Sequence, residues 1–381
     1  MAERRRLLIV VNEIESFFNH RAPHAAAARD AGYEVHIAMQ QAAAARARDA
    51  YGFTFHSLPL TRGLGAPWHN IAAAYALRRL LRAIRPALVH AYTLKPVLVA
   101  GLVCRSAGVP FVASITGTGS WFVATRWHEH AVRAVLLPPL RLATGKAAQV
   151  MVQNQTDAGL VHDSLRVPPP RITCTRGSGV DLSVFHPAAT PAAEPVQVVL
   201  AARMIADKGI SDFVAAARLL TQRGVEARFV LAGPLDPDNK RHICENTLAC
   251  WQADGTVTWL GHVDDMAGLY RRAHIACLPS YYREGLPKSL LEAAACGLPV
   301  VTTDTPGCRD AVIDGQTGIL VPPRDPDALA AALMPLIADA ALRARLGAAG
   351  RAFMAAEFST ATVSHQTLNV YAQALAATER G

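Results

Sequence analysis

The stretch that decides the fold runs from residue 275 to residue 303 and reads Ile275-Ala-Cys-Leu-Pro-Ser-Tyr-Tyr-Arg-Glu-Gly-Leu-Pro-Lys-Ser-Leu-Leu-Glu-Ala-Ala-Ala-Cys-Gly-Leu-Pro-Val-Val-Thr-Thr303. Short apolar runs predict buried strands over Ile275–Pro279 and Val300–Thr303, and the alanine- and leucine-rich run between them predicts a helix over Lys288–Cys296. A strand, a helix and a second strand in succession form a crossover that joins parallel strands. The stretch therefore predicts one unit of a parallel sheet.

The same alternation continues along the rest of the chain. Further strands are predicted over Leu7–Val11, Glu34–Ala38, Ala87–Ala91, Phe111–Ile115, Val150–Gln153, Gln197–Ala201, Arg228–Ala232 and Val257–Leu260. Helices are predicted over Ala22–Ala31, Ile71–Ile84, Pro96–Ala107, Ile210–Arg223 and Thr360–Ala377, and helical pattern fills most of the chain beyond residue 303. The fold class is α/β, with parallel sheets covered by helices on both faces.

The chain length predicts two domains. A chain of 381 residues is too long for one ordinary core. The segment Pro187–Pro195 carries three prolines and no apolar periodicity, which is typical of a linker, and it ends a seam over Val180–Pro195. We therefore expect one domain over 1–187 and another over 188–358. Ligands of open α/β sheets bind at the carboxyl ends of the strands, which we expect to face a cleft between the domains.

Charge is unevenly distributed along the chain. Residues 1–187 carry a net charge of +11, and the remainder carries −3. This asymmetry indicates that the first half faces an anionic partner, such as nucleic acid, a membrane surface or a phosphorylated acceptor. The alternative is a solvated basic face with no partner.

Composition also bears on the compartment. The apolar patch after the N-terminal arginines stops at Asn12, short of a signal-peptide core, and no window is apolar enough to span a membrane. The seven cysteines are odd in number and show no C-x-x-C or zinc spacing. A cytosolic protein with reduced structural thiols and no metal site is expected.

Two cations follow the first strand of the predicted second domain. Arg203 and Lys208 lie in the loop between that strand and the helix that begins at Ile210. Positive side chains beside the free amides of a helix N-terminus can hold a diphosphate. The alternative is a pair of solvated loop charges.

Two carboxylates flank the helix of the opening stretch. Glu284 lies in the loop before the helix and Glu292 about one turn inside it, with Pro287 at the helix start and Gly285 open to close backbone approach. Loop and helix dimensions allow a separation on the order of 10 Å. That spacing suits one carboxylate on a ribose diol and another on a sugar, because each oxygen accepts a hydrogen bond from a hydroxyl. Without further context, a surface acid at each position is the alternative.

The context resembles a known family. The string Leu278–Val300 resembles the signature of glycosyltransferase family four, a retaining family with the GT-B fold of two Rossmann-like domains. The resemblance extends over the second domain through Ala202-Arg203, Lys208-Gly209, Phe229-Val-Leu-Ala-Gly233, Leu260-Gly261-His262, Thr305-Pro-Gly-Cys308 and Gly315-Gln-Thr-Gly-Ile-Leu-Val-Pro-Pro323. In the first domain, Phe17-Phe-Asn-His-Arg21, Tyr92-Thr-Leu-Lys-Pro96, Ile115-Thr-Gly-Thr-Gly119 and Gly177-Ser-Gly-Val-Asp181 are similar to the subgroup that extends polyprenyl-diphosphate-linked sugars in O-antigen, capsule and N-glycan assembly.

The resemblance implies a role for each matched residue. Arg203 and Lys208 would neutralise the donor diphosphate, and Glu284 would complete the catalytic set by holding the transferred sugar. The implied donor-binding residues are Arg203, Lys208, Glu284, Gly285, Leu286, Glu292, Gly233 and His262, with Glu292 on the ribose. The implied acceptor-binding residues are His20, Arg21, Lys95 and Thr116. The last helix, about residues 359–381, would pack back on the first, acceptor-binding domain.

The implied reaction is retaining transfer of an N-acetylhexosamine from a UDP-sugar to a polyprenyl-diphosphate-linked saccharide, with no metal cofactor. The spacing Asp236-Pro-Asp238 lies in a Gly/Pro loop and is interpreted as turn chemistry. Two features depart from the family pattern. No glycine follows the first strand within Asn12–Asn19, and Thr116-Gly117 stands where some relatives carry a histidine. His90, at a neighbouring strand end, is as well explained by packing as by chemistry.

A membrane contact is the remaining expectation. Trp121, Phe122 and Trp127 mix with basic residues up to Lys146, as in segments that lie in the membrane interface. This predicts a protein bound to the cytoplasmic face of the inner membrane; the alternative is a helix that packs on its own sheet. Rival functions are a GT-B nucleotide-sugar epimerase and a non-catalytic nucleotide-sugar-binding module. Nucleic-acid binding has no supporting aromatic-basic motif.

Overall fold

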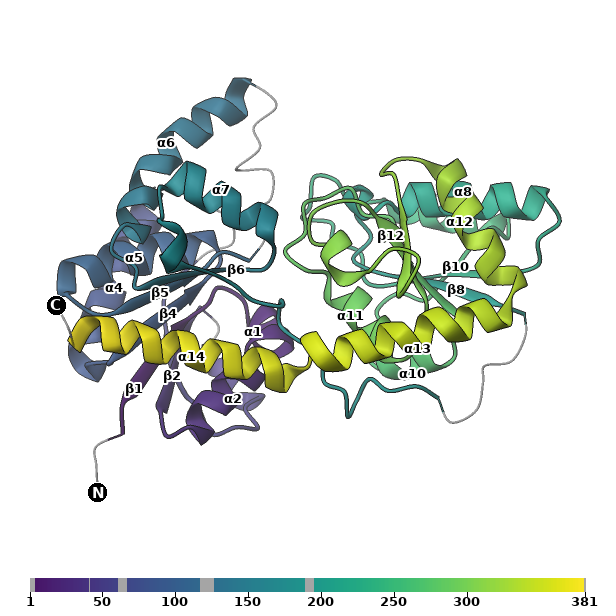
Figure 1. Cartoon of the computed structure of the whole chain (residues 1–381). Coiled ribbons are helices and arrows are strands. Elements are labelled where there is room, and N and C mark those ends of the chain that lie inside the picture. Colours follow the sequence, from purple (N-terminus) through teal and green to yellow (C-terminus); the bar gives the residue numbers. More distant parts are fainter. Residues whose placement is uncertain (1–3, 41, 61–66, 117–126, 189–194, 380–381) are drawn as a thin grey trace. The chain divides into compact units, whose positions relative to one another are not determined.

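A computed structural model describes residues 4–40, 42–60, 67–116, 127–188 and 195–379 (Figure 1). The chain divides into two compact units, residues 1–178 with 360–381 and residues 179–359. The division falls earlier than the predicted boundary at residue 187. Val180 is fully buried in the core of the second unit and bridges Ser359, so the start of the predicted seam belongs to that unit. Residues 189–194 of the predicted linker lie outside the described residues.

The first unit is built on a parallel seven-stranded sheet with the order β3-β2-β1-β4-β5-β6-β7. Its strands are β1 Arg6–Val10, β2 Glu34–Met39, β3 Thr54–Ser57, β4 Leu88–Tyr92, β5 Phe111–Ser114, β6 Gln149–Val152 and β7 Ile172–Cys174. Its helices are α1 Ile14–His20, α2 Ala22–Asp30, α3 Ala42–Ala47, α4 Pro67–Ile84, α5 Leu94–Ala107, α6 Trp127–Thr144, α7 Gln155–Leu165 and α14 Thr360–Glu379. α5 ends at Ala107, and Gly108 just after it takes the left-handed conformation.

Alternate residues of the central strands feed two cores. Leu8 and Val10 of β1 pack with α4, α5, α6 and α7, whereas Leu7 and Ile9 pack with α1, α2, α3 and α14. Because side chains alternate along a strand, these helices cover the two opposite faces of the sheet. The last helix, α14, packs against α2, β4 and β5 (Figure 1, yellow).

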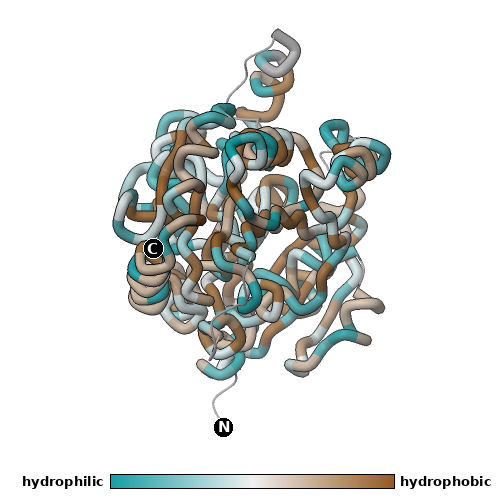
Figure 2. Tube along the Cα trace, turned by 90° about the vertical axis from the view of Figure 1, so that its right-hand side faces the viewer, coloured by the Kyte–Doolittle hydropathy of each residue, from teal (hydrophilic) through white to brown (hydrophobic). Residues whose placement is uncertain are grey.

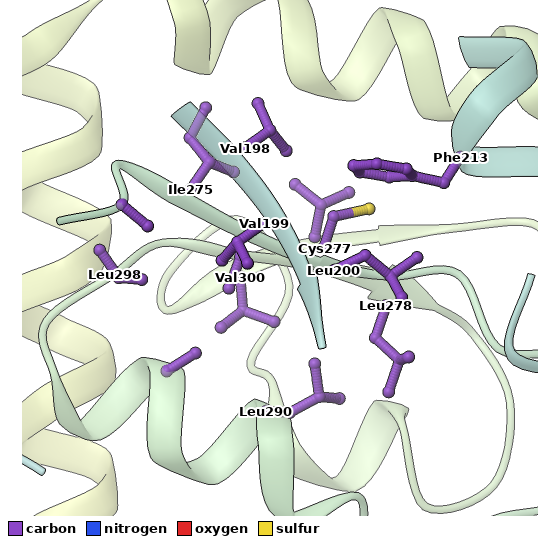
Figure 3. Packing of buried hydrophobic residues seen from close by; sticks show 14 of the residues in the cluster. Val198, Val199, Leu200, Phe213, Ile275, Cys277, Leu278, Leu290, Leu298 and Val300 are labelled. Carbon is purple, nitrogen blue, oxygen red and sulfur yellow. The ribbon is translucent and has the colours of Figure 1, made fainter. Parts of the chain in front are cut away.

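The second unit is built on a parallel six-stranded sheet with the order β10-β9-β8-β11-β12-β13. Its strands are β8 Gln197–Ala201, β9 Arg228–Ala232, β10 Thr258–Trp259, β11 Ile275–Leu278, β12 Val300–Thr303 and β13 Gly318–Val321. Its helices are α8 Ile210–Gln222, α9 Glu245–Ala253, α10 Met266–Arg271, α11 Lys288–Ala295, α12 Pro326–Ala338 and α13 Ala340–Glu357. Figure 3 shows Phe213 of α8 and Leu290 of α11 approaching β8 and β11 from opposite sides.

Three strands were not predicted, and each lies at a sheet edge. β3 and β7 border the first sheet, and β13 borders the second. β13 lies beyond residue 303, where helical pattern was expected to fill most of the chain. β3 and β7 are short and contain polar residues, so they lack the continuous apolar run of a central strand. β13 reads Gly-Ile-Leu-Val and is apolar, but it is only four residues long. In Figure 2 hydrophobic and hydrophilic segments alternate along the chain.

The cysteines and the apolar helices bear on the expected compartment. All seven cysteines are free thiols. Among the described helices, none combines the length and the apolar character needed to cross a membrane.

Candidate functional site

The loop after β8 carries the two predicted cations. β8 ends at Ala201, and a short 3-10 turn over Ala206–Lys208 leads into α8. Gly209, which joins the turn to the helix, is left-handed, and a Cβ at this position would stand 2.0 Å from the carbonyl oxygen of Pro279. The chain can therefore pass this close to the end of β11 because residue 209 is glycine. That approach brings Lys208 to the loop that follows β11.

Lys208 and Glu284 meet at this junction. The Lys208 ammonium forms an ion pair with Glu284 Oε1, and the two side chains are 15% and 13% exposed. Ser280 Oγ lies 3.0 Å from the same carboxylate oxygen. A largely buried ion pair with a further hydroxyl partner is held more firmly than a surface pair. The structure thus brings together two residues that the sequence placed 76 positions apart.

Backbone contacts fix the loop that carries Glu284. The amides of Tyr281 and Tyr282 donate to the carbonyl oxygen of Asp207 over 3.1 and 3.3 Å. The Thr303 hydroxyl and, over 3.2 Å, the Thr305 hydroxyl donate to the carbonyl oxygen of Ser280. The β8 loop and the end of β12 therefore clamp the β11 loop from two sides.

A second loop closes on the backbone of Glu284 and Gly285. Gly307 is left-handed, and a Cβ there would stand 2.5 Å from the Glu284 carbonyl oxygen and 2.7 Å from that of Gly285. The Gly307 amide donates to Asp310 over 2.9 Å. Leu286 follows with its side chain packed against the core of the unit. The sequence motif around Gly307 does not by itself predict this contact.

Glu292 lies in the second turn of α11, after a start at Pro287 that matches the prediction. Its carboxylate pairs with Lys288 over 3.4 Å, and its side chain is 12% exposed. Burial raises the pKa of Glu292 above its usual value, and the nearby Lys288 ammonium partly offsets this. A buried carboxylate of this kind is ready to accept hydrogen bonds from ligand hydroxyls.

The counter-ion of Arg203 is Asp236, from the Asp236-Pro-Asp238 segment that was interpreted as a turn. The Arg203 guanidinium forms an ion pair with Asp236, whose side chain is 9% exposed, while Arg203 itself is 48% exposed. Asp236 lies in the loop after β9, next to Gly233, where a Cβ would stand 1.8 Å from the Ala202 carbonyl oxygen. Glycine at 233 thus lets the two loops touch. The Gly233 amide donates to the carbonyl oxygen of Gly261 over 2.7 Å, and the side chain of the next residue, His262, is 68% exposed with its Nε2 3.2 Å from Asp264 Oδ1.

In the first unit, Arg21 is a predicted acceptor residue whose charged side chain is buried. It is 7% exposed, and its guanidinium lies over the Tyr92 ring at 4.3 Å. Burial lowers its pKa, and its Nε finds no hydrogen-bond partner within the described chain. Arg21 and Thr116 line one narrow pocket at the carboxyl ends of β4, β5 and β6. The sheet therefore unites these two predicted residues.

The other two acceptor candidates are placed differently. His20 Nδ1 lies 3.1 Å from Ser178 Oγ. Lys95 lies in the first turn of α5, 4% exposed, and burial lowers its pKa. Neither residue is among those that line the pocket of Arg21 and Thr116.

His90 belongs to a buried polar network. Its Nδ1 lies 2.7 Å from the Tyr371 hydroxyl and its Nε2 lies 2.7 Å from Ser114 Oγ. The His90 ring also lies 4.0 Å from the Tyr92 ring, centroid to centroid. Burial, with Arg21 and His24 nearby, lowers the pKa of His90 well below its usual value. His90 is therefore a neutral, packed residue with both ring nitrogens engaged.

Comparisons with known proteins decide the family. Residues 195–339 match the family model described as glycosyl transferases group 1, and residues 6–154 match that described as glycosyl transferase 4-like. Glycogen synthase of Mycobacterium tuberculosis is 30% identical over 347 residues, which are 86% of this chain and 79% of that protein. The chain belongs to the group 1 glycosyltransferases.

The chain is also similar to glycosyltransferases whose names give substrates different from those of glycogen synthase. An N,N'-diacetylbacillosaminyl-diphospho-undecaprenol alpha-1,3-N-acetylgalactosaminyltransferase of Campylobacter jejuni is 24% identical over 93% of this chain and 95% of its own. Sucrose-phosphate synthase from Thermosynechococcus elongatus superposes with a TM-score of 0.79 at 22% identity, covering 98% of this chain and 100% of that chain. Anabaena HepE, solved with UDP and glucose, gives 0.78 at 17% identity over 97% and 99%. These structures establish the GT-B fold of the glycosyltransferase.

Proposed function

We propose that this glycosyltransferase moves a sugar, an N-acetylhexosamine, from a UDP-sugar to a polyprenyl-diphosphate-linked saccharide, with retention at the anomeric carbon. The observation that carries the donor half is the buried Lys208–Glu284 pair at the entrance to α11. The named C. jejuni relative, an N-acetylgalactosaminyltransferase with an undecaprenol-linked substrate, supports the sugar and the acceptor class. The solved HepE complex with UDP and glucose supports the nucleotide.

The donor is proposed to lie along the strand ends of the second unit. Glu292 accepts hydrogen bonds from the ribose, and Glu284 with the amides of Gly285 and Leu286 holds the transferred sugar. Arg203 and Lys208 face the diphosphate between these two ends. Gly233 keeps the Arg203 loop in place, and His262 completes the donor contacts from its exposed loop.

Catalysis is proposed to rest on the two cations. The bond between the anomeric carbon and the diphosphate oxygen breaks, and negative charge grows on the leaving diphosphate. Arg203 and Lys208 each hold a carboxylate in the described structure, Asp236 and Glu284 respectively. The diphosphate competes with these carboxylates for the cations, so the site stabilises the charge that develops in the transition state. The acceptor hydroxyl attacks the face that the diphosphate leaves and gives its proton to a diphosphate oxygen.

The acceptor is proposed to bind at the strand ends of the first unit. The buried Arg21 donor without a partner among the described residues and the adjoining Thr116 suit an anionic group such as a diphosphate. His20 and Lys95 are proposed to extend this binding site. The protein is proposed to work at the cytoplasmic face of the inner membrane and without a metal ion.

The test separates donor binding from transfer. Thermal shift with UDP and GDP is expected to favour UDP, and transfer from UDP-N-acetylhexosamine to a prenyl-diphosphate sugar is expected in EDTA as well as in buffer. Glu284→Ala should abolish transfer while UDP still stabilises the protein, since Glu284 holds the sugar and not the nucleotide. Glu226→Ala, an exposed acid of the same unit, is the control. Full transfer by Glu284→Ala, or epimerised UDP-sugar without acceptor, would refute the assignment.

A further inference from the structure

The outer face of α4 carries large apolar side chains. Trp68, Ile71 and Tyr75 are 69%, 70% and 66% exposed, while Ala73 and Leu77 on the opposite side of the helix are fully buried. At 3.6 residues per turn, positions 68, 71 and 75 share one stripe. Single exposed apolar residues are common on protein surfaces. Three large ones along the same stripe of a helix form an apolar patch, and such patches are typical of binding surfaces.

Arginines continue the same stripe. Arg79 and Arg82 follow Tyr75 at helical spacing and are exposed. In the part of the chain that the structure describes, no acidic residue pairs with Arg79, Arg82 or Arg85. At the end of α4, a hollow of about 650 Å³ is lined by arginines at and just after the end of this helix and just before and at the start of β1. Its lining arginines are Arg4, Arg5, Arg6, Arg82 and Arg85.

We infer that this face of α4, from Trp68 to the arginine hollow, binds an anionic lipid surface. Indole and phenol rings favour the boundary between headgroups and acyl chains, and arginines at the same level are attracted to anionic headgroups. The stripe from residue 68 to residue 82 is about 21 Å long, so a helix lying in the plane of the interface presents both parts at once. This lipid contact specifies the membrane location given under the proposed function. Lipid binding follows from the α4 face alone, and only its role in sugar transfer rests on the proposed function.

The position of α4 in the sheet fits a lipid-linked acceptor. α4 connects β3 to β4, which are parallel, so it runs from the carboxyl edge of the sheet to the amino edge. Its aromatic end therefore lies toward the edge that holds Arg21 and Thr116. A membrane at this face would present a prenyl-linked substrate on the side where the acceptor residues are.

The segment singled out in the sequence is less suited to this contact. Residues 121–126 lie outside the described residues. In α6, Arg141 donates to the carbonyl oxygen of Ser164 over 2.8 Å, and Arg133 approaches the Ser164 hydroxyl at 3.3 Å. These cations therefore face α7, and the exposed side chains of α6 include the apolar Val135, which is 72% exposed, and Leu142, which is 48% exposed.

Vesicle sedimentation tests the inference with matched variants of the whole chain. The protein should pellet with phosphatidylcholine vesicles that contain phosphatidylglycerol, much less with phosphatidylcholine alone, and less at high salt. The triple variant W68S/I71S/Y75S should bind at least tenfold more weakly. R79Q/R82Q should lose about fivefold for each arginine. The apolar control V135S/L142S on α6 and the charge control R272Q/R345Q on the second unit should bind like the wild type.

Several results would overturn the inference. Loss of vesicle binding in V135S/L142S with full binding by the α4 variants would assign the contact to α6. A concentration-dependent dimer in light scattering that W68S/I71S/Y75S dissolves would assign the face to a second copy of the chain. Binding to RNA but not to vesicles, lost in R79Q/R82Q, would assign it to nucleic acid. Thermal shift with UDP is the independent readout, because it reports the donor site whether or not the α4 face binds lipid.

Discussion

At the scale of single residues, Glu292 shows a conflict between stability and binding. Its carboxylate is largely buried, and burial raises its pKa, so the folded chain binds this proton more tightly than the unfolded chain does. A raised folded pKa means that its stabilising effect is present at low pH and is lost as the pH rises through that pKa. At neutral pH the charged Glu292 therefore costs stability in the absence of ligand.

The prediction is that Glu292→Gln keeps or raises the melting temperature at neutral pH but loses most of the stabilisation by UDP. The amide removes the buried charge, and it replaces a strong acceptor for ribose hydroxyls with a weaker one. Thermal shift with and without UDP measures both effects. A variant that is less stable without ligand and still fully stabilised by UDP would contradict this role for Glu292.

Asp236 is the second residue whose function depends on a charge. It holds the guanidinium of Arg203, which is otherwise half exposed. Asp236→Asn should leave Arg203 unrestrained, so kcat is expected to fall about tenfold, while removal of a competing carboxylate should keep KM for the donor the same or lower it.

Asp238→Asn is the matched control for this prediction, since Asp238 is exposed and lies two positions along the same loop. Steady-state kinetics should show the change for Asp236→Asn alone. An equal loss in both variants, relieved by added divalent cations, would instead point to a metal held by the two acids.

At the scale of elements, the site depends on loops that approach closely. Gly307 and Gly315 are both left-handed, so alanine strains either position by about 1 kcal/mol. A Cβ at 307 would collide with the backbone of Glu284 and Gly285, whereas a Cβ at 315 would meet nothing within 4 Å. Gly307→Ala should therefore shift the loop that carries Glu284.

The expected result is a larger loss of stability in Gly307→Ala than in Gly315→Ala, because only the first adds a collision to the backbone strain, and about a hundredfold loss of transfer only in the first. Urea unfolding and transfer assays on both variants provide the comparison. Equal activity in the two variants would show that contact with Gly307 does not position Glu284.

The elements also show what a sequence can predict. Central strands such as β8 and β11 have continuous apolar runs, and their bounds match within a residue or so. The edge strand β3, which reads Thr54-Phe-His-Ser57, has no such run and was not predicted. The contacts of Asp236 with Arg203 and of Gly307 with Glu284 join loops from different strands. No local pattern marks such pairs, because their geometry arises from the order of strands in the sheet.

At the scale of the whole molecule, the two units contain buried ionisable groups of opposite effect. In the first unit, burial lowers the pKa of His90 well below 6.5, and the pKa values of His36 and His56 are lowered too. Once the pH falls below about 6.5, the unfolded chain binds more protons than the folded chain. The free energy of unfolding of the first unit therefore decreases as the pH decreases. In the second unit, burial raises the pKa values of Glu292 and Asp207, and this makes the second unit more stable as the pH decreases.

Acidification from about pH 7.5 to about pH 5.5 is therefore expected to destabilise the first unit selectively. Hydrogen exchange of the intact chain, corrected for the intrinsic rate at each pH, should show protection falling in β1, β4 and α14 but not in β8 and β11. His90→Gln removes the largest of these shifts and should flatten the dependence, even if its overall protection is lower. Equal loss in both units, or an unchanged slope in His90→Gln, would mean that the buried network of His90 and Tyr371 does not control the acid response.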